Sequence, residues 1–308
     1  MTSFKCQVCD EEFSSEKGLH LHLKKHKMDL ATYYTTYYPR KNLLTGDPLP
    51  FKNKSDYFSK DFSTRRQLLK WCDQEKPNKT KPYILKKLKE RIDEKDLKRG
   101  PNHLELKLAG LPDLEIYKKL FGSYSKACET AGVKPLFNKK LDRDFFTETD
   151  SEHINIFIDT REQKPLSFKN SSELKLDFGD YTAGGDQYSY TYIDRKSEQD
   201  FKGTLSGGFE RFKRELNRVK EFNSYLFIVT ESDLNKIYKN NKWGPHKSNL
   251  KFVYHNMRVL THEFSDCCQF VFTGNRNNSE KLIPKILKFG KKLWGVDLQY
   301  YIDKNGLD

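Results

Sequence analysis

The sequence predicts a multidomain α+β protein with a small ββα unit, a helical middle region and a C-terminal α/β domain built on a central mixed sheet. Three observations lead to this prediction. Two cysteines and two histidines stand at metal-ligand spacing near the N-terminus, the middle of the chain has helical periodicity, and β-rich runs alternate with helical stretches after residue 153. The predicted parts are the ββα unit at 1–29, an aromatic and basic linker region with short helices at 30–82, a helical unit at 83–137, a linker at 138–152 and the α/β domain at 153–308.

The charge of the chain favours a polyanionic partner. Over 308 residues the formal net charge is +13, and 32% of the residues are charged. Nucleic acid is therefore the first candidate partner, and an acidic membrane surface is the second. Aromatic residues make up 14% of the chain, which argues against wholesale disorder.

The sequence carries no signal for export or membrane insertion. No apolar run approaches the roughly 18 residues that a membrane span needs, and the first residues lack the apolar stretch of a signal peptide. We therefore expect no membrane partner and no secretion. The expected location is the cytoplasm (of a bacterial host cell, if the chain is phage-encoded) or a eukaryotic nucleus. In a reducing compartment the six cysteines are interpreted as metal ligands or core residues rather than disulfides.

The N-terminal segment has the ligand spacing of a structural zinc site, Cys-x2-Cys-x12-His-x3-His. A zinc ion needs four such ligands in a tetrahedron, and a hairpin followed by a helix can supply them. Phe13 and Leu19 provide a minimal apolar core between the two pairs. The pattern resembles the C2H2 zinc finger and predicts one structural Zn²⁺. Its ligands would be Cys6, Cys9, His22 and His26.

The finger does not carry a base-reading pattern. The helix positions that contact bases in such fingers fall on Ser15, Gly18 and Leu21. None of these offers a bidentate match to guanine or adenine. We therefore expect either a clamp on the DNA backbone or a contact with another protein. The lysines suited to phosphate are Lys17, Lys24 and Lys25.

Two short helices are expected in the linker region, at 30–38 and 64–74. A basic helix is also expected at 83–92, and a second helix is expected to end near Gly110. Gly122 would permit a tight turn, Ser123 would cap the next helix, and Gly132 would end it.

The order Tyr117-x-x-x-Phe121-Gly-Ser-Tyr, followed by Ala127-x-x-x-Ala131-Gly132, is similar to a short helical repeat associated with homing endonucleases. That resemblance implies docking on DNA, and the alternative is a generic helical spacer with solvated lysines. The lysines placed near phosphate would be Lys86, Lys87, Lys118 and Lys119.

The C-terminal domain reads as strands framed by helices. The run at 225–229 is apolar throughout and predicts a buried parallel strand. Other strands are expected at 154–158, 174–178, 188–193 and 268–273, with a turn at 184–186 and helices at 209–222, 232–239, 248–264 and 279–294.

Two aspartates near strand ends suggest a metal site. Asp180 and Asp194 stand fourteen residues apart, a separation that a hairpin can close so that both point to one place. Mg²⁺ takes few carboxylates and keeps waters, which leaves room for a phosphate oxygen. Lys196 lies on the same strand face as Asp194, where its ammonium can orient or help deprotonate a water and offset charge on a phosphorane. This is the chemistry of metal-assisted phosphodiester cleavage.

Three motifs in order extend this pattern: Asp159-x-Arg161-Glu162, Gly179-Asp180-Tyr181 and Asp194-Arg195-Lys196-Ser197-x-x-Asp200. Together they resemble the nuclease domain of the XPF family, a branch of the restriction-endonuclease-like PD-(D/E)XK nucleases, over about residues 153–290. The family usually has Glu where this chain has Asp194. The resemblance implies that Asp180 and Asp194 bind the metal and that Lys196 is the catalytic lysine. It further implies support of the metal or water by Asp159 and Glu162, phosphate binding or bracing by Arg161 and Arg195, and an outer role for Asp200.

The expected activity is that of a DNA endonuclease that uses Mg²⁺ or Mn²⁺, acts on double-stranded DNA and needs no small-molecule cofactor. The combination of parts resembles free-standing homing endonucleases of phages. A structure-specific nuclease for branched or flapped DNA and a DNA-binding regulator with a silent nuclease fold are the alternatives. Arg211 and Arg214 are further candidates for DNA contact, and a homodimer is left open.

Overall fold

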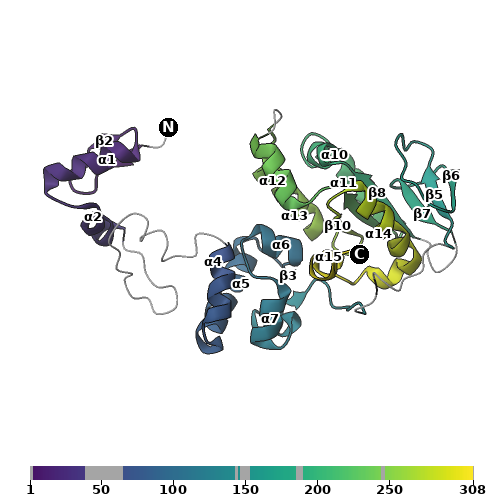
Figure 1. Cartoon of the computed structure of the whole chain (residues 1–308), viewed down its shortest axis with the longest axis horizontal. Helices are drawn as coiled ribbons and strands as arrows, with labels where there is room; N and C mark the ends of the chain where they lie inside the picture. The colour runs from purple at the N-terminus through teal and green to yellow at the C-terminus, as the bar shows by residue number, and fades with distance from the viewer. Residues whose placement is uncertain are drawn as a thin grey trace. The chain divides into compact units, whose positions relative to one another are not determined.

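The computed structural model describes residues 3–38, 65–142, 145, 153–184, 190–243 and 247–307. Most of the predicted linker at 138–152, the middle of the linker region at 39–64 and most of the turn at 184–186 lie outside these residues. Contacts divide the chain into two units, Met1–Arg91 with Gly110–Ser123 and Ile92–Ala109 with Tyr124–Asp308 (Figure 1). No helix of the described residues is long and apolar enough to cross a membrane.

The N-terminal part of the first unit is a ββα structure with one more helix packed on it. Ser15 starts the first helix by accepting a hydrogen bond from the Gly18 N–H. Tyr33 of the added helix is fully buried, and its hydroxyl accepts from the Gln7 N–H. The added helix, which the sequence placed in the linker region, therefore completes the core of the finger. The elements are β1 (Phe4–Lys5), β2 (Glu12–Phe13), α1 (Glu16–His22), η1 (Leu23–His26) and α2 (Leu30–Tyr37).

The other elements that the structure describes in the first unit are helices. Trp71 packs edge-on against Tyr83, and the Arg65 guanidinium donates to the carbonyl of Leu111 at 2.8 Å. Gly122 has a φ of 83° at the end of its helix, where the sequence predicted a tight turn. The elements are α4 (Arg65–Gln74), α5 (Pro77–Glu94), whose last residues belong to the second unit, and α7 (Leu114–Phe121).

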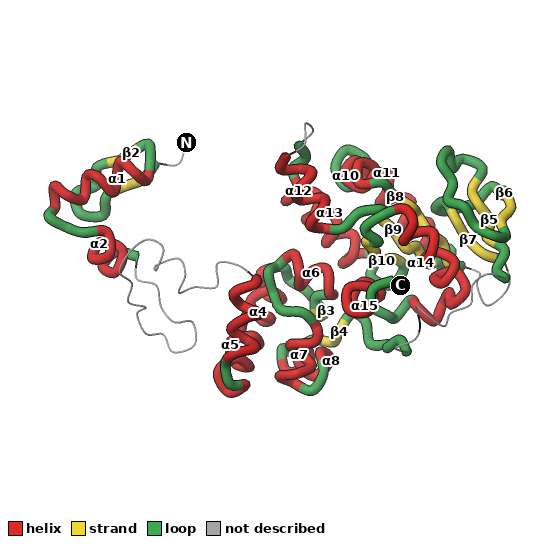
Figure 2. Tube along the Cα trace, viewed as in Figure 1, coloured by secondary structure: helices red, strands yellow, loops and turns green. Residues whose placement is uncertain are grey.

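The second unit contains a six-stranded mixed sheet in the order β10-β9-β8-β7-β5-β6 (Figure 2). β7 is antiparallel to β5 and β8, whereas β8, β9 and β10 run parallel, so the predicted mixed sheet and its buried parallel strand are confirmed. The strands are β5 (Ile156–Asp159), β6 (Ser171–Leu174), β7 (Tyr181–Ala183), β8 (Thr191–Lys196), β9 (Tyr225–Thr230) and β10 (Cys268–Phe272).

The predicted strand at 174–178 is wrong. The strand of this region is β6, which ends at Leu174 and is exposed along its length. Leu176 and Phe178 are buried in the loop that follows, and the Leu176 N–H donates to a carboxylate oxygen of Asp159 instead of to a neighbouring strand. Two alternating apolar residues thus mark a buried loop as well as they mark a strand.

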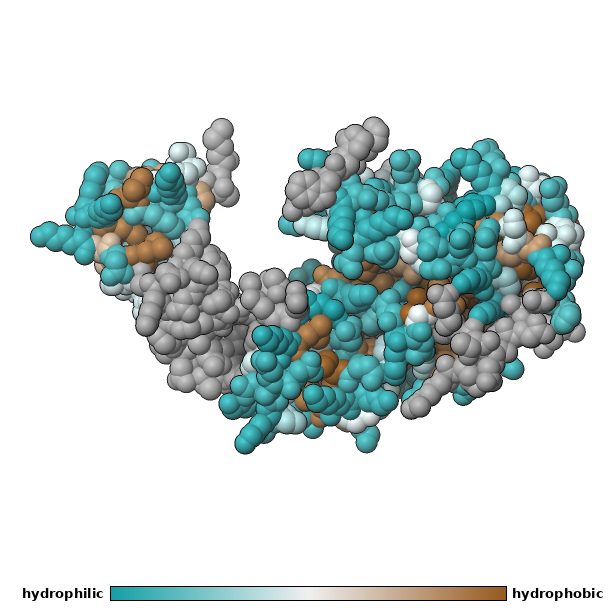
Figure 3. All heavy atoms as spheres, viewed as in Figure 1, coloured by the Kyte–Doolittle hydropathy of each residue, from teal (hydrophilic) through white to brown (hydrophobic). Residues whose placement is uncertain are grey.

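Helices cover both faces of the sheet. On one face Tyr225 and Phe227 of β9 share a core with α14 and α15, and on the other Leu226 and Ile228 share a core with α10, α11 and α13. The helices α10 and α15 were not predicted. The elements are β3 (Arg99–Gly100), α6 (His103–Leu108), α8 (Tyr124–Thr130), β4 (Lys134–Pro135), α10 (Glu198–Thr204), α11 (Phe209–Glu221), α12 (Leu234–Trp243), α13 (Leu250–Glu263), α14 (Arg276–Phe289), η2 (Gly290–Leu293) and α15 (Leu298–Asn305). On the face drawn in Figure 3, hydrophilic residues cover most of the described surface.

Part of the predicted helical unit belongs to this second unit. The His103 imidazole lies 2.8 Å from an oxygen of Asp303 on α15, and Lys107 lies 2.6 Å from the same oxygen. The backbone N–H of His103 donates to Asp297. Burial by itself would raise the pKa of Asp303, but its hydrogen bonds from His103 and Lys107 lower that pKa to about 2. These polar contacts hold α6 against α15.

We predict that Asp303→Asn destabilises the protein by about 1–2 kcal/mol near neutral pH. Because the pKa of Asp303 falls from 3.8 to about 2 on folding, its contribution is complete above about pH 5 and is lost as the pH falls toward about 2. Urea unfolding near neutral pH and at about pH 3 should therefore show that the variant has a lower free energy of unfolding than the wild type, and that this deficit is smaller at the acidic pH. The exposed Asp177 provides the control Asp177→Asn, which should follow the wild type. A deficit of equal size at both pH values would contradict this account.

Candidate functional site

The hairpin of β7 and β8 brings Asp180 and Asp194 together, as their spacing predicted. The Asp180 N–H donates to the carbonyl of Ile193 at 2.7 Å, and the Arg195 N–H donates to Oδ2 of Asp180 at 2.7 Å. The backbone of β8 thus holds the first aspartate beside the residue that follows the second.

The turn before Asp180 requires glycine. Gly179 has a φ of 57°, and a Cβ at this position would lie 2.4 Å from the carbonyl oxygen of Ile193. A side chain would therefore force the turn away from β8. The close backbone approach at Gly179 is what sets the position of Asp180.

Asp194 and Lys196 form a buried ion pair. Nζ of Lys196 lies 2.9 Å from Oδ1 and 2.8 Å from Oδ2 of Asp194, and it also lies 5.0 Å from the centre of the Phe212 ring. Burial alone would lower the pKa of Lys196, but Asp194 outweighs this effect and the pKa is raised. The amine therefore stays charged at neutral pH, so it donates hydrogen bonds and holds its proton.

The two aspartates repel each other. Burial, and then the charge of Asp194, raise the pKa of Asp180 to about 8, although the hydrogen bond from the Arg195 N–H acts in the opposite direction. Two carboxylates that cannot both ionise easily are a favourable setting for a cation. Because the donors are carboxylate oxygens, they fit a hard divalent ion such as Mg²⁺.

Asp159, predicted to support the metal, is fully engaged by other groups. Oδ1 accepts from the backbone N–H and Nε of Arg161, and Oδ2 accepts from the Arg161 guanidinium and the Leu176 N–H. Burial would raise the pKa of Asp159, but these hydrogen bonds lower it to about 2. The bond from Leu176, together with a bond from the Arg161 guanidinium to the Leu176 carbonyl, ties the end of β5 to the loop that precedes Asp180. Arg161 is thus placed as a brace, although 63% of its side chain is exposed.

Arg195 is also placed as a brace. Its guanidinium lies 3.1 Å from Glu162 and 3.0 Å from Glu231, and only 10% of the side chain is exposed. The other oxygen of Glu162 accepts from the Lys164 N–H. Between the two roles predicted for Arg195, the contacts favour bracing over phosphate binding.

The hydrogen bonds of Asp200 are with Ser197 and not with Asp180 or Asp194. It shares a 2.6 Å hydrogen bond with the Ser197 hydroxyl, which in turn accepts from the Asp200 N–H and begins α10. This arrangement secures the start of the helix that directly follows β8.

Glu215 on α11 is a functional candidate that the sequence analysis missed. Its Oε1 accepts from the Gly179 N–H at 3.4 Å. Burial, and then the charge of Asp194, raise the pKa of Glu215. The available signal was a carboxylate directly beside the apolar helix positions Phe212 and Leu216, where a charged side chain is unusual.

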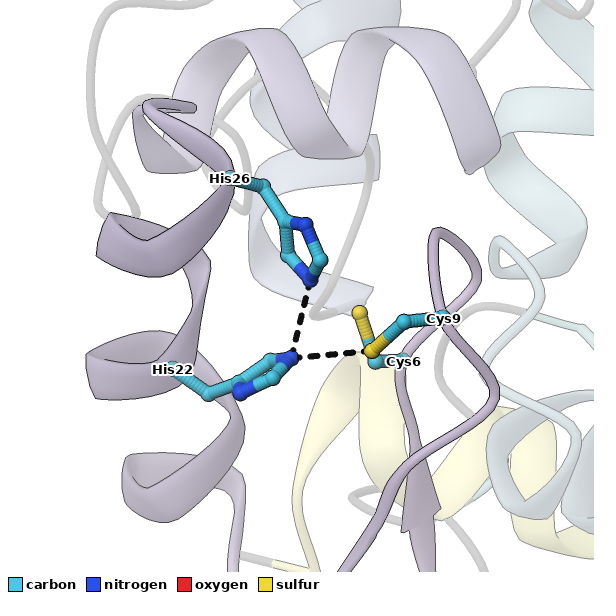
Figure 4. Close-up of side chains that lie close together, drawn as sticks. All are labelled: Cys6, Cys9, His22 and His26. Atoms are coloured by element: carbon cyan, nitrogen blue, oxygen red, sulfur yellow. Dashed lines mark hydrogen bonds between the residues drawn. The ribbon is translucent and has the colours of Figure 1, made fainter.

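The four predicted zinc ligands meet at one point (Figure 4). One ligand atom from each of Cys6, Cys9, His22 and His26 lies within 4.8 Å of the other three. Nε2 of His22 is 3.1 Å from the Cys9 sulfur and 3.0 Å from Nε2 of His26. Atoms this close suit ligands that share one ion through bonds of about 2.0–2.3 Å.

The basic residues proposed to touch DNA fall into two groups. Lys86 and Lys87 both lie near Glu90, at 3.9 and 2.7 Å, and Lys119 lies 3.6 Å from Asp73. Within the described part of the chain, no ion pair involves the others, which are all exposed. These are Lys17, Lys24, Lys25, Lys118, Arg211 and Arg214.

Comparisons with known proteins find similarity among solved structures. No family model matches the chain, and no curated protein matches it. Among solved structures it is similar to XPF from Aeropyrum pernix, with a TM-score of 0.34 and 16% identity over 44% of this chain and 66% of that one. It is also similar to XPF from Aeropyrum pernix in complex with DNA, with a TM-score of 0.33 and 18% identity over 44% of this chain and 63% of that one. In both cases the match spans less than two thirds of the other chain.

Proposed function

We propose that this protein is a metal-dependent DNA endonuclease that hydrolyses phosphodiester bonds. Its active site would be formed by Asp180, Asp194 and Lys196. The observation that carries the proposal is the pair of carboxylates brought together by the β7–β8 hairpin, with an ammonium bonded to one of them. Two carboxylates can hold a metal ion that activates water, and a nearby ammonium can offset the charge of the reacting phosphate. An intact Asp194–Lys196 pair also speaks against a silent nuclease fold.

Asp180 and Asp194 would hold Mg²⁺ or Mn²⁺. When bound, such an ion polarises a phosphoryl oxygen and lowers the pKa of a bound water. Asp180 must give up its proton to act as a ligand, and its raised pKa means that it does so readily only above neutral pH or in competition with a cation. Lys196 keeps its charge, orients Asp194 and offsets negative charge that gathers on the phosphate.

The substrate is proposed to be double-stranded DNA. The net charge of +13 and the exposed cations, which include Lys24 in the finger and Arg214 on α11, suit contacts with the phosphate backbone. A structural Zn²⁺ held by the Cys/His cluster would keep the finger folded, because a unit with so small a core depends on its metal. Site-directed cleavage of the homing type is proposed because the finger and the repeat-like segment accompany the nuclease site. A homodimer would allow both strands to be cut.

Substituting Asp180→Asn or Lys196→Ala should lower cleavage by at least about 100-fold, because each removes a charged group from the reacting site. DNA affinity should change little, since neither side chain is among the exposed cations. Both quantities can be measured on a long duplex with Mg²⁺, as the rate of cleavage and as the dissociation constant without metal. Glu210→Gln, at an exposed position of α11, is the control. Undiminished cleavage by either variant would rule out this site.

Mapping the cut ends on long genomic DNA and on synthetic junctions separates homing from structure-specific cleavage. Homing predicts one or a few defined sequences. Cuts at branch points of any sequence would instead favour a nuclease for branched or flapped DNA.

Purified protein should contain about one zinc ion per chain, and Cys9→Ala should lose most of it. The finger should then unfold and DNA binding should weaken, while the second unit stays folded. Elemental analysis and DNA titration give the two readouts. His20→Ala is the matched control. His20 lies on α1, the helix that also carries the ligand His22, but its side chain contacts Tyr34 instead of the cluster. Full zinc content in the Cys9 variant would contradict the assignment, and unchanged DNA affinity despite zinc loss would point to a protein partner for the finger.

A further inference from the structure

We propose that one side of α11 binds an unpaired strand of DNA, with arginines on its phosphates and Phe222 stacked on one of its bases. This inference rests on the proposed function and adds the form of DNA that this surface contacts. We call the surface, formed by Arg211, Arg214, Arg218 and Phe222, the α11 flank.

The spacing of these four residues places them along one side of the helix. Steps of three, four and four residues separate them, and residues so spaced are neighbours on a helix surface. Phe222 is the residue at which α11 ends. The rise from Arg211 to Phe222 is about 16 Å, which is the length of about five stacked nucleotides of one strand. The flank is therefore long enough to follow a short stretch of DNA strand.

Phe178 joins this flank to the proposed active site. Cζ of Arg218 lies 5.8 Å from the centre of the Phe178 ring. The Phe222 ring lies edge-on to the same ring, with 5.6 Å between the two ring centres. Phe178 is buried, and it stands two residues before Asp180. The α11 flank thus borders the turn that positions the first proposed metal ligand.

The arginines of the flank are available to bind phosphate. All three are exposed, and in the part of the chain that the structure describes no ion pair involves them. By contrast, Lys213 and Lys220 of the same helix are paired with Glu263 and Asp266. Glu215, an acid on this side of α11, is partly buried and accepts a hydrogen bond from the backbone of the turn before Asp180. Guanidinium groups without a protein carboxylate partner suit the phosphates of a strand.

Phe222 favours an unpaired strand over a duplex. It is 61% exposed, although the contact with Phe178 holds one edge of its ring. Single exposed apolar residues are common on proteins, but this one continues a line of three arginines. Cations combined with an aromatic ring are the pattern of surfaces that bind single strands. Paired bases cover each other's faces inside a duplex, so a ring at the protein surface can stack on a base only where the strand is unpaired.

Phe222→Ala tests the stacking contact in the full chain. The probe is a fluorescent oligothymidylate of about six nucleotides, and its dissociation constant is measured by anisotropy without divalent metal, so that no cleavage occurs. The constant should rise about 10-fold. An oligonucleotide of the same length with abasic sites throughout should bind the variant and the wild type alike, because it has no base to stack. Phe222→Trp should keep the affinity, and Phe252→Ala, at a position of α13 that is 48% exposed, is the matched control.

Arg218→Ala tests the phosphate contact. Binding of both oligonucleotides should weaken, and the slope of the logarithm of the binding constant against the logarithm of salt concentration should become shallower by about 0.7. A variant that only loosened the packing of α11 would leave this slope unchanged. Lys220→Ala is the control on the same helix, because Lys220 is paired with Asp266, and it should keep the wild-type slope.

Three results would overturn the inference. Equal losses on the thymidylate and the abasic probe would mean that Phe222 only maintains the surface. Equal losses on the thymidylate and a blunt duplex would mean that the flank binds paired DNA. Unchanged affinity of Phe222→Ala for every probe would assign the exposed ring to another kind of partner. Each of these results leaves the nuclease proposal intact if Asp180→Asn abolishes cleavage, whereas loss of the nuclease proposal would show as undiminished cleavage by that variant.

Discussion

The close approach of the turn at Gly179 to strand β8 is the constraint on which the candidate site depends. A positive φ and a backbone that nearly touches the Ile193 carbonyl allow the Asp180 N–H to bond to β8. That bond sets Asp180 against the Arg195 N–H and near the Asp194–Lys196 pair. Without this close approach the two carboxylates would lie on one face but further apart. The repulsion between their charges, which favours binding of a cation, would then be weaker.

Two sets of ionic contacts keep this arrangement rigid. Asp159 and Arg161 tie the end of β5 to the loop that leads into Gly179, and Arg195 links the acids after β5 and β9. Each buried charge in these sets has a partner, so the cost of burying it is offset locally. Removing one partner would leave its counterpart buried and unpaired, so mutations in these braces are expected to lower stability. Mutations in the proposed metal ligands are expected to lower metal binding instead.

The described parts outside the sheet show how modules of this chain are stabilised. The finger has too few apolar residues for a core of its own, and Tyr33 from the following helix fills that core while its hydroxyl bonds to the finger backbone. Part of the helical middle region is likewise secured by α15, through the carboxylates Asp297 and Asp303. In both places a helix that the sequence analysis placed outside a predicted unit packs against that unit.

The sequence by itself determined the features that depend on local spacing. The Cys/His cluster, the turn at Gly122, the all-buried strand β9 and the pairing of Asp180 with Asp194 follow from periods and separations along the chain. The strand predicted at 174–178 failed because burial of Leu176 and Phe178 comes from loop packing, which produces the same alternation. Only the tertiary structure decided which acids have their carboxylate oxygens occupied by hydrogen bonds from other groups. Asp159 is saturated by Arg161 and Leu176, while Glu215 reaches the site from a helix far along the chain. Hydrogen-bond partners of this kind are set by distance in space, and no local pattern encodes that distance.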